Sequence, residues 1–239
     1  MLRLEGVTRT FRGGAGVCDL TFEVDPGEIV ALVGLNGAGK TTLMRLSLGM
    51  LRPQRGTVRL LGHVVDAAPA DAWAQVGALI EAPLAYPELS VQQNLHMAGL
   101  LHRGEPGWVG NSLETWQLGT VADRRFRRLS LGTRQRVGLA AALQHDPRLI
   151  VLDEPSNSLD PSSVILLREQ LTQRAREGAA ILVSSHHLDE VSRIADRVLL
   201  MNAGRVIGNL DTAGTDLERA FFERIRLDDA RRDCVEEMR

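Results

Sequence analysis

The chain has 239 residues, with 28 lysines and arginines against 30 aspartates and glutamates, and a formal net charge of -2 at pH 7. This balance gives no global attraction to nucleic acid or to anionic lipid. The two cysteines, Cys18 and Cys234, stand far apart, so neither a disulfide framework nor a zinc site is indicated, which fits a reducing cytoplasm. Apolar runs such as residues 29–35 are much shorter than the about 20 residues that a membrane helix needs. Residues 1–5 do not resemble a signal peptide, so we expect any membrane role to come through partner chains.

The N-terminal third predicts strands around one helix. Cys18, Leu20, Phe22 and Val24 alternate with polar residues, which is the period of a half-buried strand. Residues 28–33 follow a turn at 25–27 and predict a buried strand. After it, leucines recur at helical spacing until near Gly49, and a turn at 52–56 leads into a strand at 57–61.

The pattern becomes helical from about residue 83 to residue 129. Residues 90–93 form a capping box that opens a helix through Leu101. Leu113, Trp116 and Leu118 mark another helix, which we expect Gly119 to end. We interpret this segment as a helical subdomain inserted into an α/β core.

Strands and a helix alternate again in the C-terminal half. Residues 149–152 and 180–184 predict strands, with a helix at 161–176 between them, and residues 197–201 and 205–207 predict a hairpin. This alternation predicts an α/β fold with a mainly parallel sheet, an N-terminal antiparallel β part and the inserted helices. We expect one domain over 1–239, with its core at about 1–82 and 130–210, its helical subdomain at about 83–129 and a short tail at 211–239.

The turn after the strand at 28–33 carries the most specific motif. It matches G-x-x-x-x-G-K-[ST] at every required position and lies between a strand and a helix, as a phosphate loop must. Glycines let the backbone wrap a phosphate closely, and amides at the helix start point at the anion. Lys40 would reach the β- and γ-phosphates of ATP, and the Thr41 hydroxyl would ligate Mg2+. The nucleotide-binding residues expected here are Gly34, Leu35, Asn36, Gly37, Ala38, Gly39, Lys40, Thr41 and Thr42.

Two carboxylates follow the strand at 149–152. Asp153 at this position is expected beside the magnesium of the phosphate loop, as in other phosphate-loop hydrolases. Glu154 is placed to polarise the attacking water as a catalytic residue. A solvated acid pair at a strand end is the plainer interpretation, but the phosphate loop favours catalysis. His186 follows another buried strand at the same sheet edge and is the second catalytic candidate, with His187 as its competitor.

Together these motifs resemble, in order and over almost the whole chain, the ATP-binding subunits of ABC transporters. Residues 129–136 are similar to the family's LSGGQ-x-QR signature, with Leu131 replacing a glycine and Thr133 the glutamine. Ser130 suits the N-cap of a helix whose exposed amides would face phosphate. The resemblance implies that Ser130 and Gly132 complete the ATP site of an opposite subunit.

The resemblance assigns further residues to the nucleotide. Residues 158–160 resemble the family's D-loop, which adds Asp160 to the site, and His186 resembles the switch histidine that contacts the γ-phosphate. Phe11 resembles the aromatic residue that stacks on adenine, with Val17 packing near the sugar. Leu35 replaces the usual proline of the phosphate loop.

Glu81 stands where most members have a glutamine, at the junction of the core and the helical subdomain. A glutamate there, with Pro83 and the residues up to Ser90, resembles the subgroup that exports bacitracin and lantibiotics. A carboxylate can still ligate magnesium or orient water. The resemblance therefore adds Glu81 to Thr41 and Asp153 as a metal ligand, while drift at a tolerant position is the plainer interpretation.

The implied partners are a membrane-spanning permease and a second ATP-binding subunit, either an identical copy or a related chain. The expected location is the cytoplasmic face of the membrane, reached through the permease, and the expected cargo is an antibiotic, an antimicrobial peptide or a drug. The permease would dock on the helices after Pro83, where Met97, Leu100 and Leu101 are either contact or core residues. A soluble ATPase scaffold and an ABC ATPase for another substrate remain alternatives, whereas chromosome-organising ATPases carry a coiled coil that this sequence lacks.

Four arginines precede the signature, at positions 124, 125, 127 and 128. Because the chain is acidic overall and only Phe126 is interleaved with them, a solvated surface explains them better than a nucleic-acid footprint. We therefore expect no nucleic-acid partner.

Overall fold

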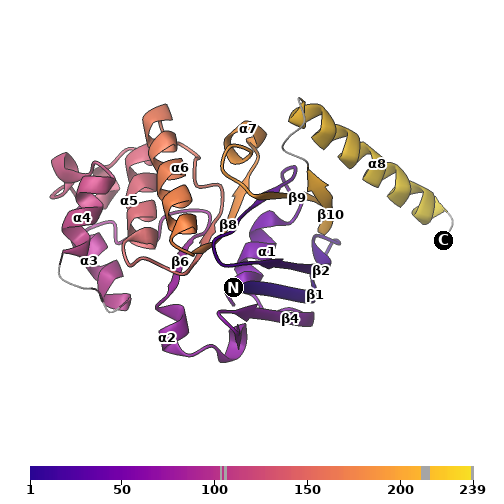
Figure 1. Ribbon diagram of the computed structural model, residues 1–239, viewed down its shortest axis with the longest axis horizontal. Coiled ribbons are helices and arrows are strands. Elements are labelled where there is room, and N and C mark those ends of the chain that lie inside the picture. Colours follow the sequence, from indigo (N-terminus) through magenta and orange to yellow (C-terminus); the bar gives the residue numbers. More distant parts are fainter. Residues whose placement is uncertain (103, 105–106, 211–215, 238–239) are drawn as a thin grey trace.

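A computed structural model of the protein describes every residue except 103, 105–106, 211–215 and 238–239, with side chains placed up to residue 232. The chain folds into two sheets, with helices around the larger one (Figure 1). None of the helices among the described residues is long and apolar enough to cross a membrane.

The smaller sheet is antiparallel and N-terminal, as predicted. Its order is β2-β1-β4-β5, formed by β2 (Gly16–Val24), β1 (Leu2–Thr10), β4 (Arg55–Leu60) and β5 (His63–Val64). The expected inward position of Cys18 is wrong, because its side chain is exposed. Asp19 has a left-handed φ of +50°, and the β1–β2 register shifts nearby. This irregularity breaks the alternation, so Val17 is buried in place of Cys18, whereas Leu20 is buried as predicted.

The larger sheet is mainly parallel and has the order β10-β9-β3-β8-β7-β6. Its strands are β10 (Arg205–Leu210), β9 (Arg197–Asn202), β3 (Ile29–Val33), β8 (Ala180–Ser185), β7 (Leu149–Leu152) and β6 (Val76–Leu79). Only β9 and β10 pair antiparallel, as the predicted hairpin. The carboxyl ends of β3, β8, β7 and β6 therefore meet at one edge of the sheet.

Each face of the larger sheet supports a separate hydrophobic core. The first core joins Ile29, Ala31 and Val33 to leucines of α5 (Leu131–Leu143) and α6 (Pro161–Arg176). The second joins Val30 and Leu32 to α1 (Lys40–Ser47) and to the antiparallel sheet. Figure 1 shows α5 and α6 on one side of the sheet, with α1 and the antiparallel strands on the other. Because β3 is buried on both faces, its sequence is a continuous apolar run.

The predicted helical segment contains α3 (Val91–Leu101), α4 (Trp108–Thr115) and short 3-10 turns at Gly119–Val121 and Phe126–Arg128. The capping box is present as predicted, because the Ser90 side chain accepts from the Gln93 N–H and the Gln93 side chain accepts from the Ser90 N–H. The expected end of the second helix at Gly119 is wrong. The helix ends at Thr115, and Gln117 takes the left-handed conformation (φ +52°).

Three helices fall outside the sequence predictions: α2 (Ala70–Trp73), α7 (Leu188–Val191) and α8 (Leu217–Glu237). The last is long and lies beside β9 and β10 at the edge of the molecule (Figure 1). It buries Phe221 and Ile225, and the Asn202 amide donates to Asp228 and Asp229 at 2.9 and 2.8 Å. The predicted tail thus includes an ordered helix that packs against the core.

Candidate active site

The loop between β3 and α1 has the backbone geometry of an anion cradle. Gly37 and Gly39 have positive φ values of +84° and +102°, which are unfavourable for residues that carry a Cβ atom. A Cβ at Gly34 would lie 2.4 Å from the Met201 carbonyl oxygen, so that position has no room for a side chain. No side chain caps the start of α1, which leaves its first amides available to an anion.

Lys40 folds back across this loop. Its Nζ donates to the Gly34 carbonyl at 2.7 Å and lies 3.5 Å from Glu154 Oε1. The lysine is buried, so its ammonium needs these oxygen partners. Its position at the first residue of α1 puts a positive charge where the loop amides converge.

A buried carboxylate and two hydroxyls form the centre of the site. Asp153 Oδ2 accepts from the Thr41 hydroxyl at 2.7 Å, and Asp153 Oδ1 accepts from the Ser184 hydroxyl at 2.6 Å. Asp153 is only 4% exposed. Thr41 and Asp153 supply hard oxygen atoms, which are the ligands that Mg2+ prefers, and Mg2+ commonly takes only one or two protein ligands beside substrate phosphates and water. These residues fit a magnesium ion carried with a nucleotide.

Ser184 is a site residue that the sequence predictions missed. Besides donating to Asp153, its hydroxyl oxygen accepts from the Glu154 N–H at 2.8 Å. It thereby orients both acidic residues from the neighbouring strand. The only signal in the sequence is a serine pair that ends the apolar run of β8.

Glu154 and His186 form the next pair outward. The Glu154 carboxylate accepts from His186 Nδ1–H at 2.7 Å and from the His186 backbone N–H at 3.2 Å. The competing His187 stacks obliquely on His186, with ring centroids 3.9 Å apart. Glu154 also has a left-handed φ of +47°, which is uncommon for a residue with a side chain. The arrangement links a carboxylate, a histidine and the phosphate-loop lysine in one row.

The signature residues lie at the start of α5. Ser130 is its N-cap, and its Oγ accepts from the Thr133 N–H at 3.3 Å. A Cβ at Gly132 would lie 2.5 Å from the Ser158 carbonyl, so only glycine lets this helix approach residues 158–160. Leu131 points the other way and is 69% exposed. Gln135, which belongs to the signature at 129–136, donates to the Pro155 carbonyl at 3.0 Å and so connects the helix to the loop after Glu154.

Asp160 serves as the N-cap of α6 in this structure. Its carboxylate accepts from the Ser162 hydroxyl at 2.6 Å and from the Ser163 N–H at 2.8 Å. These hydrogen bonds, the one from Ser162 foremost, lower the pKa of Asp160 to about 2. The predicted contact of Asp160 with a nucleotide stays a prediction.

The residues expected to contact adenine and the sugar lie at opposite ends of the loop between β1 and β2. Phe11 is 40% exposed, and the Arg9 guanidinium lies 5.4 Å from its ring centroid. Val17 is buried and packs close to the phosphate loop, since a Cβ at Gly39 would lie 3.1 Å from its Cγ1. Phe11 is accessible for stacking on a base, and both assignments stay predictions.

Glu81 lies just beyond β6. Its carboxylate pairs with Arg45 of α1, with 2.6 Å between Oε2 and Nη2. Leu79, two residues earlier, accepts the Asp153 N–H through its carbonyl at 2.8 Å. Glu81 is thus adjacent to the Asp153 strand, and its role as a magnesium ligand stays a prediction.

Comparisons with known proteins agree with this geometry. A family profile described as ABC transporter matches residues 17–157, more than half of the chain. The bacitracin transport ATP-binding protein BcrA of Enterococcus faecalis is 36% identical over 87% of this chain and 68% of that protein. The Nod factor export ATP-binding protein I of Bradyrhizobium diazoefficiens is 37% identical over 84% of this chain and 67% of that protein.

Two further comparisons cover almost the full length of both chains. The lantibiotic transport ATP-binding protein SrtF of Streptococcus pyogenes is 30% identical over 94% of this chain and 97% of that protein. A solved ATP-binding subunit of an ABC transporter superposes with a TM-score of 0.82 at 28% identity, covering 94% of each chain. The comparison of sequences and the comparison of structures therefore indicate the same family over almost the whole chain.

Proposed function

Because the chain belongs to the ABC transporter family and is an ATPase of that family, we propose that it energises export of an antibiotic, an antimicrobial peptide or a drug. The cargo crosses the membrane through a separate permease. The observation that carries this proposal is the convergence of Lys40, Asp153, Glu154 and His186 at one sheet edge. Similarity to BcrA and SrtF supports the choice of cargo.

The chemistry follows from the positions of these side chains. The loop amides and Lys40 bind the β- and γ-phosphates of ATP and neutralise the charge that develops on them. His186 binds the γ-phosphate, which gives its Nδ1–H an acceptor other than Glu154. The Glu154 carboxylate is then available to polarise the attacking water. The Ser184 hydroxyl holds the Asp153 carboxylate and the Glu154 backbone in place during this step.

Magnesium, when bound, supplies positive charge that stabilises the transferring phosphoryl group. Thr41 and Asp153 would hold it, with Glu81 as a third candidate. The Thr41 hydroxyl and the buried Asp153 carboxylate support this assignment, because their oxygen atoms are 2.7 Å apart.

A second subunit completes the site. Ser130 and Gly132 are at the start of a helix whose Thr133 N–H is capped by the Ser130 side chain, which leaves the other first-turn amides for phosphate. In our proposal they contact ATP bound to the phosphate loop of an identical copy or a related chain. Binding of ATP closes the pair, and hydrolysis opens it.

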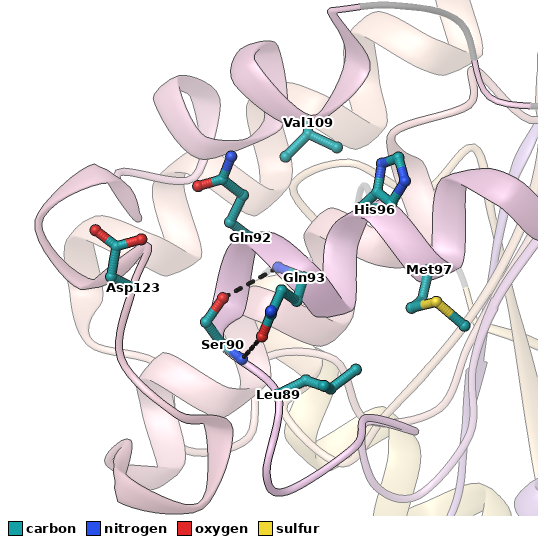
Figure 2. A pocket seen from close by; sticks show the side chains of 8 residues that line it. All are labelled: Leu89, Ser90, Gln92, Gln93, His96, Met97, Val109 and Asp123. Carbon is teal, nitrogen blue, oxygen red and sulfur yellow. Dashed lines mark hydrogen bonds between the residues drawn. The ribbon is translucent and has the colours of Figure 1, made fainter.

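The helical segment at 83–129 forms the subdomain that docks the permease. A groove of about 660 Å³ lies along the start of α3. Figure 2 shows Leu89, Met97 and Val109 around its rim together with the capping box. Leu84, Tyr86, Leu100 and Leu101 add exposed apolar surface on the same segment, which marks a protein contact. We place the chain at the cytoplasmic face of the membrane through this contact.

Deletion of the gene in its native host, with its membrane neighbour intact, tests the proposal. Sensitivity should rise for at least one compound in a panel of bacitracin, lantibiotics and amphiphilic drugs. A complementing Glu154→Gln copy should fail to restore resistance, because efflux needs turnover. No change across the panel, with no multispanning protein co-purifying, would favour a soluble ATPase scaffold. Co-purification without any change in sensitivity would point to another cargo, such as that of the Nod factor exporters.

A further inference from the structure

The segment that joins the core to α3 contains a strained turn. Glu81 has a left-handed φ of +61°, and the Ala82 N–H donates to the Ile80 carbonyl at 2.8 Å. A three-residue turn of this kind, with positive φ at its centre, is rare and strained for a residue with a side chain. Such a conformation persists only when surrounding contacts hold it.

Arg45 forms an ion pair with the residue at the centre of this turn. Its guanidinium Nη2 lies 2.6 Å from Glu81 Oε2, and about a third of the arginine and half of the glutamate remain exposed. Arg45 is on α1 one helical turn beyond Thr41, so both side chains lie on one face of the helix. The helix that begins at the phosphate loop is therefore joined directly to the turn that leads to α3.

We propose that Arg45 is a positioning residue that competes with magnesium for the Glu81 carboxylate. The proposal rests on the ATPase function given above. When Glu81 turns to the magnesium that Thr41 and Asp153 hold, it leaves Arg45 and the strained turn relaxes. The released segment, residues 82–90, leads into the groove at the start of α3. A glutamine at position 81 could form no ion pair with Arg45.

The test measures how binding of a fluorescent ATP analogue depends on Mg2+ concentration, with Glu154→Gln as the parent protein so that no ATP is consumed. Arg45→Gln should lower the Mg2+ concentration for half-saturation about two- to fivefold, the size expected for one exposed ion pair. Glu81→Gln should raise it. In the Glu81→Gln background, Arg45→Gln should have no further effect, because its competitor is gone.

Amide hydrogen exchange gives a readout that needs no nucleotide. Loss of the ion pair should accelerate exchange at the Ala82 N–H in Arg45→Gln, since the turn is then unsupported. Arg52→Gln is the matched control, because Arg52 is an exposed arginine whose long ion pair, 3.9 Å to Asp66, does not involve Glu81. It should change neither measurement.

Two results would overturn the proposal. In the first, Arg45→Gln shifts the Mg2+ concentration for half-saturation equally in the protein with Glu81 and in the protein with Glu81→Gln. The arginine would then act through its charge alone and not through Glu81. The other is no shift at all in a protein that binds Mg-ATP. If the parent protein binds no Mg-ATP, the ATPase function itself fails instead. Should Arg45→Gln not fold, Arg45→Met keeps the apolar stem of the side chain and serves the same comparison.

Discussion

Glu154 shows how one residue is constrained by several neighbours at once. Its backbone N–H is bound by Ser184, its carboxylate by His186, and its φ is left-handed. Strain of this kind at a carboxylate beside a phosphate loop is typical of active sites. The neighbours aim one carboxylate oxygen toward Lys40, so the residue is placed for chemistry and contributes little to packing.

Glu154→Gln should reduce steady-state ATP hydrolysis by more than about a hundredfold, the scale for losing a general base. ATP binding should persist, because the phosphate loop is unchanged. Phosphate release and binding of a fluorescent ATP analogue measure the two effects separately. Glu169→Gln, which changes an exposed carboxylate on α6, is the control and should retain normal turnover. Near-normal turnover in Glu154→Gln would place the base elsewhere.

At the scale of elements, a stacked histidine pair joins the helical segment to the core. His102 follows α3 and His145 follows α5, with ring centroids 3.6 Å apart. His102 Nδ1 lies 3.3 Å from the Ala74 carbonyl, and His145 Nε2–H donates to the Val76 carbonyl at 3.2 Å. Burial lowers the pKa of both rings, and the neighbouring His102 helps to lower that of His145 to about 4. Asp146 raises the pKa of His145 and Arg174 lowers it, both more weakly.

This pair predicts a loss of stability in mild acid. The pKa of His145 is about 4 in the folded protein and the ordinary histidine pKa is 6.5, so the unfolded chain binds more protons between these two pH values. The contribution of His145 to the free energy of unfolding is complete above pH 6.5. It is lost as the pH falls towards 4, by up to about 3 kcal/mol. Chemical denaturation from pH 7 to 5 measures the free energy of unfolding before most carboxylates titrate.

His145→Gln retains a donor for the Val76 carbonyl but cannot titrate, so its free energy of unfolding should vary less over this pH range. His63→Gln, at an exposed histidine on β5, should keep the full pH dependence of the wild type. Equal slopes for His145→Gln and the wild type would mean that His145 titrates normally in the folded protein.

For the whole molecule, the helix start at the phosphate loop and the helix start capped by Ser130 belong to different helices, α1 and α5. Lys40 begins the helix at the phosphate loop, whereas Ser130 caps α5 and bonds only within its own first turn among the contacts that the structure describes. In our proposal, a symmetric pair of chains would bring Ser130 of each chain to the phosphate loop of the other chain. The two residues should therefore fail in different ways when changed.

Lys40→Ala should weaken ATP binding even by an isolated monomer, because the phosphates lose a buried cation. Ser130→Ala should spare monomer binding and impair ATP-dependent dimerisation, measured by light scattering with Glu154→Gln as the parent. Thr120→Ala, at an exposed threonine in the 3-10 turn Gly119–Val121, serves as the control. Normal dimerisation by Ser130→Ala would argue against the two-subunit site.

The sequence by itself determined those parts of the protein whose residues are contiguous in the chain. The phosphate loop, the capping box at Ser90, the cap at Ser130 and the strand that precedes Asp153 were all predicted from local pattern. Each depends on hydrogen bonds or glycine conformations within a few residues, so spacing alone carries the information. The same holds for the fold class, because alternating strands and helices leave few arrangements of a parallel sheet.

Tertiary structure decided what depends on residues far apart in sequence. Ser184 joins Asp153 across 31 positions, and Arg45 joins Glu81 across 36. No local pattern marks such pairs, since they follow from strand order and from the core that α1 shares with β6 on one face of the sheet. The exposure of Cys18 likewise depends on the irregular pairing of β1 with β2. Local sequence specifies caps and turns, whereas side-chain partners and strand register are set when the elements pack together.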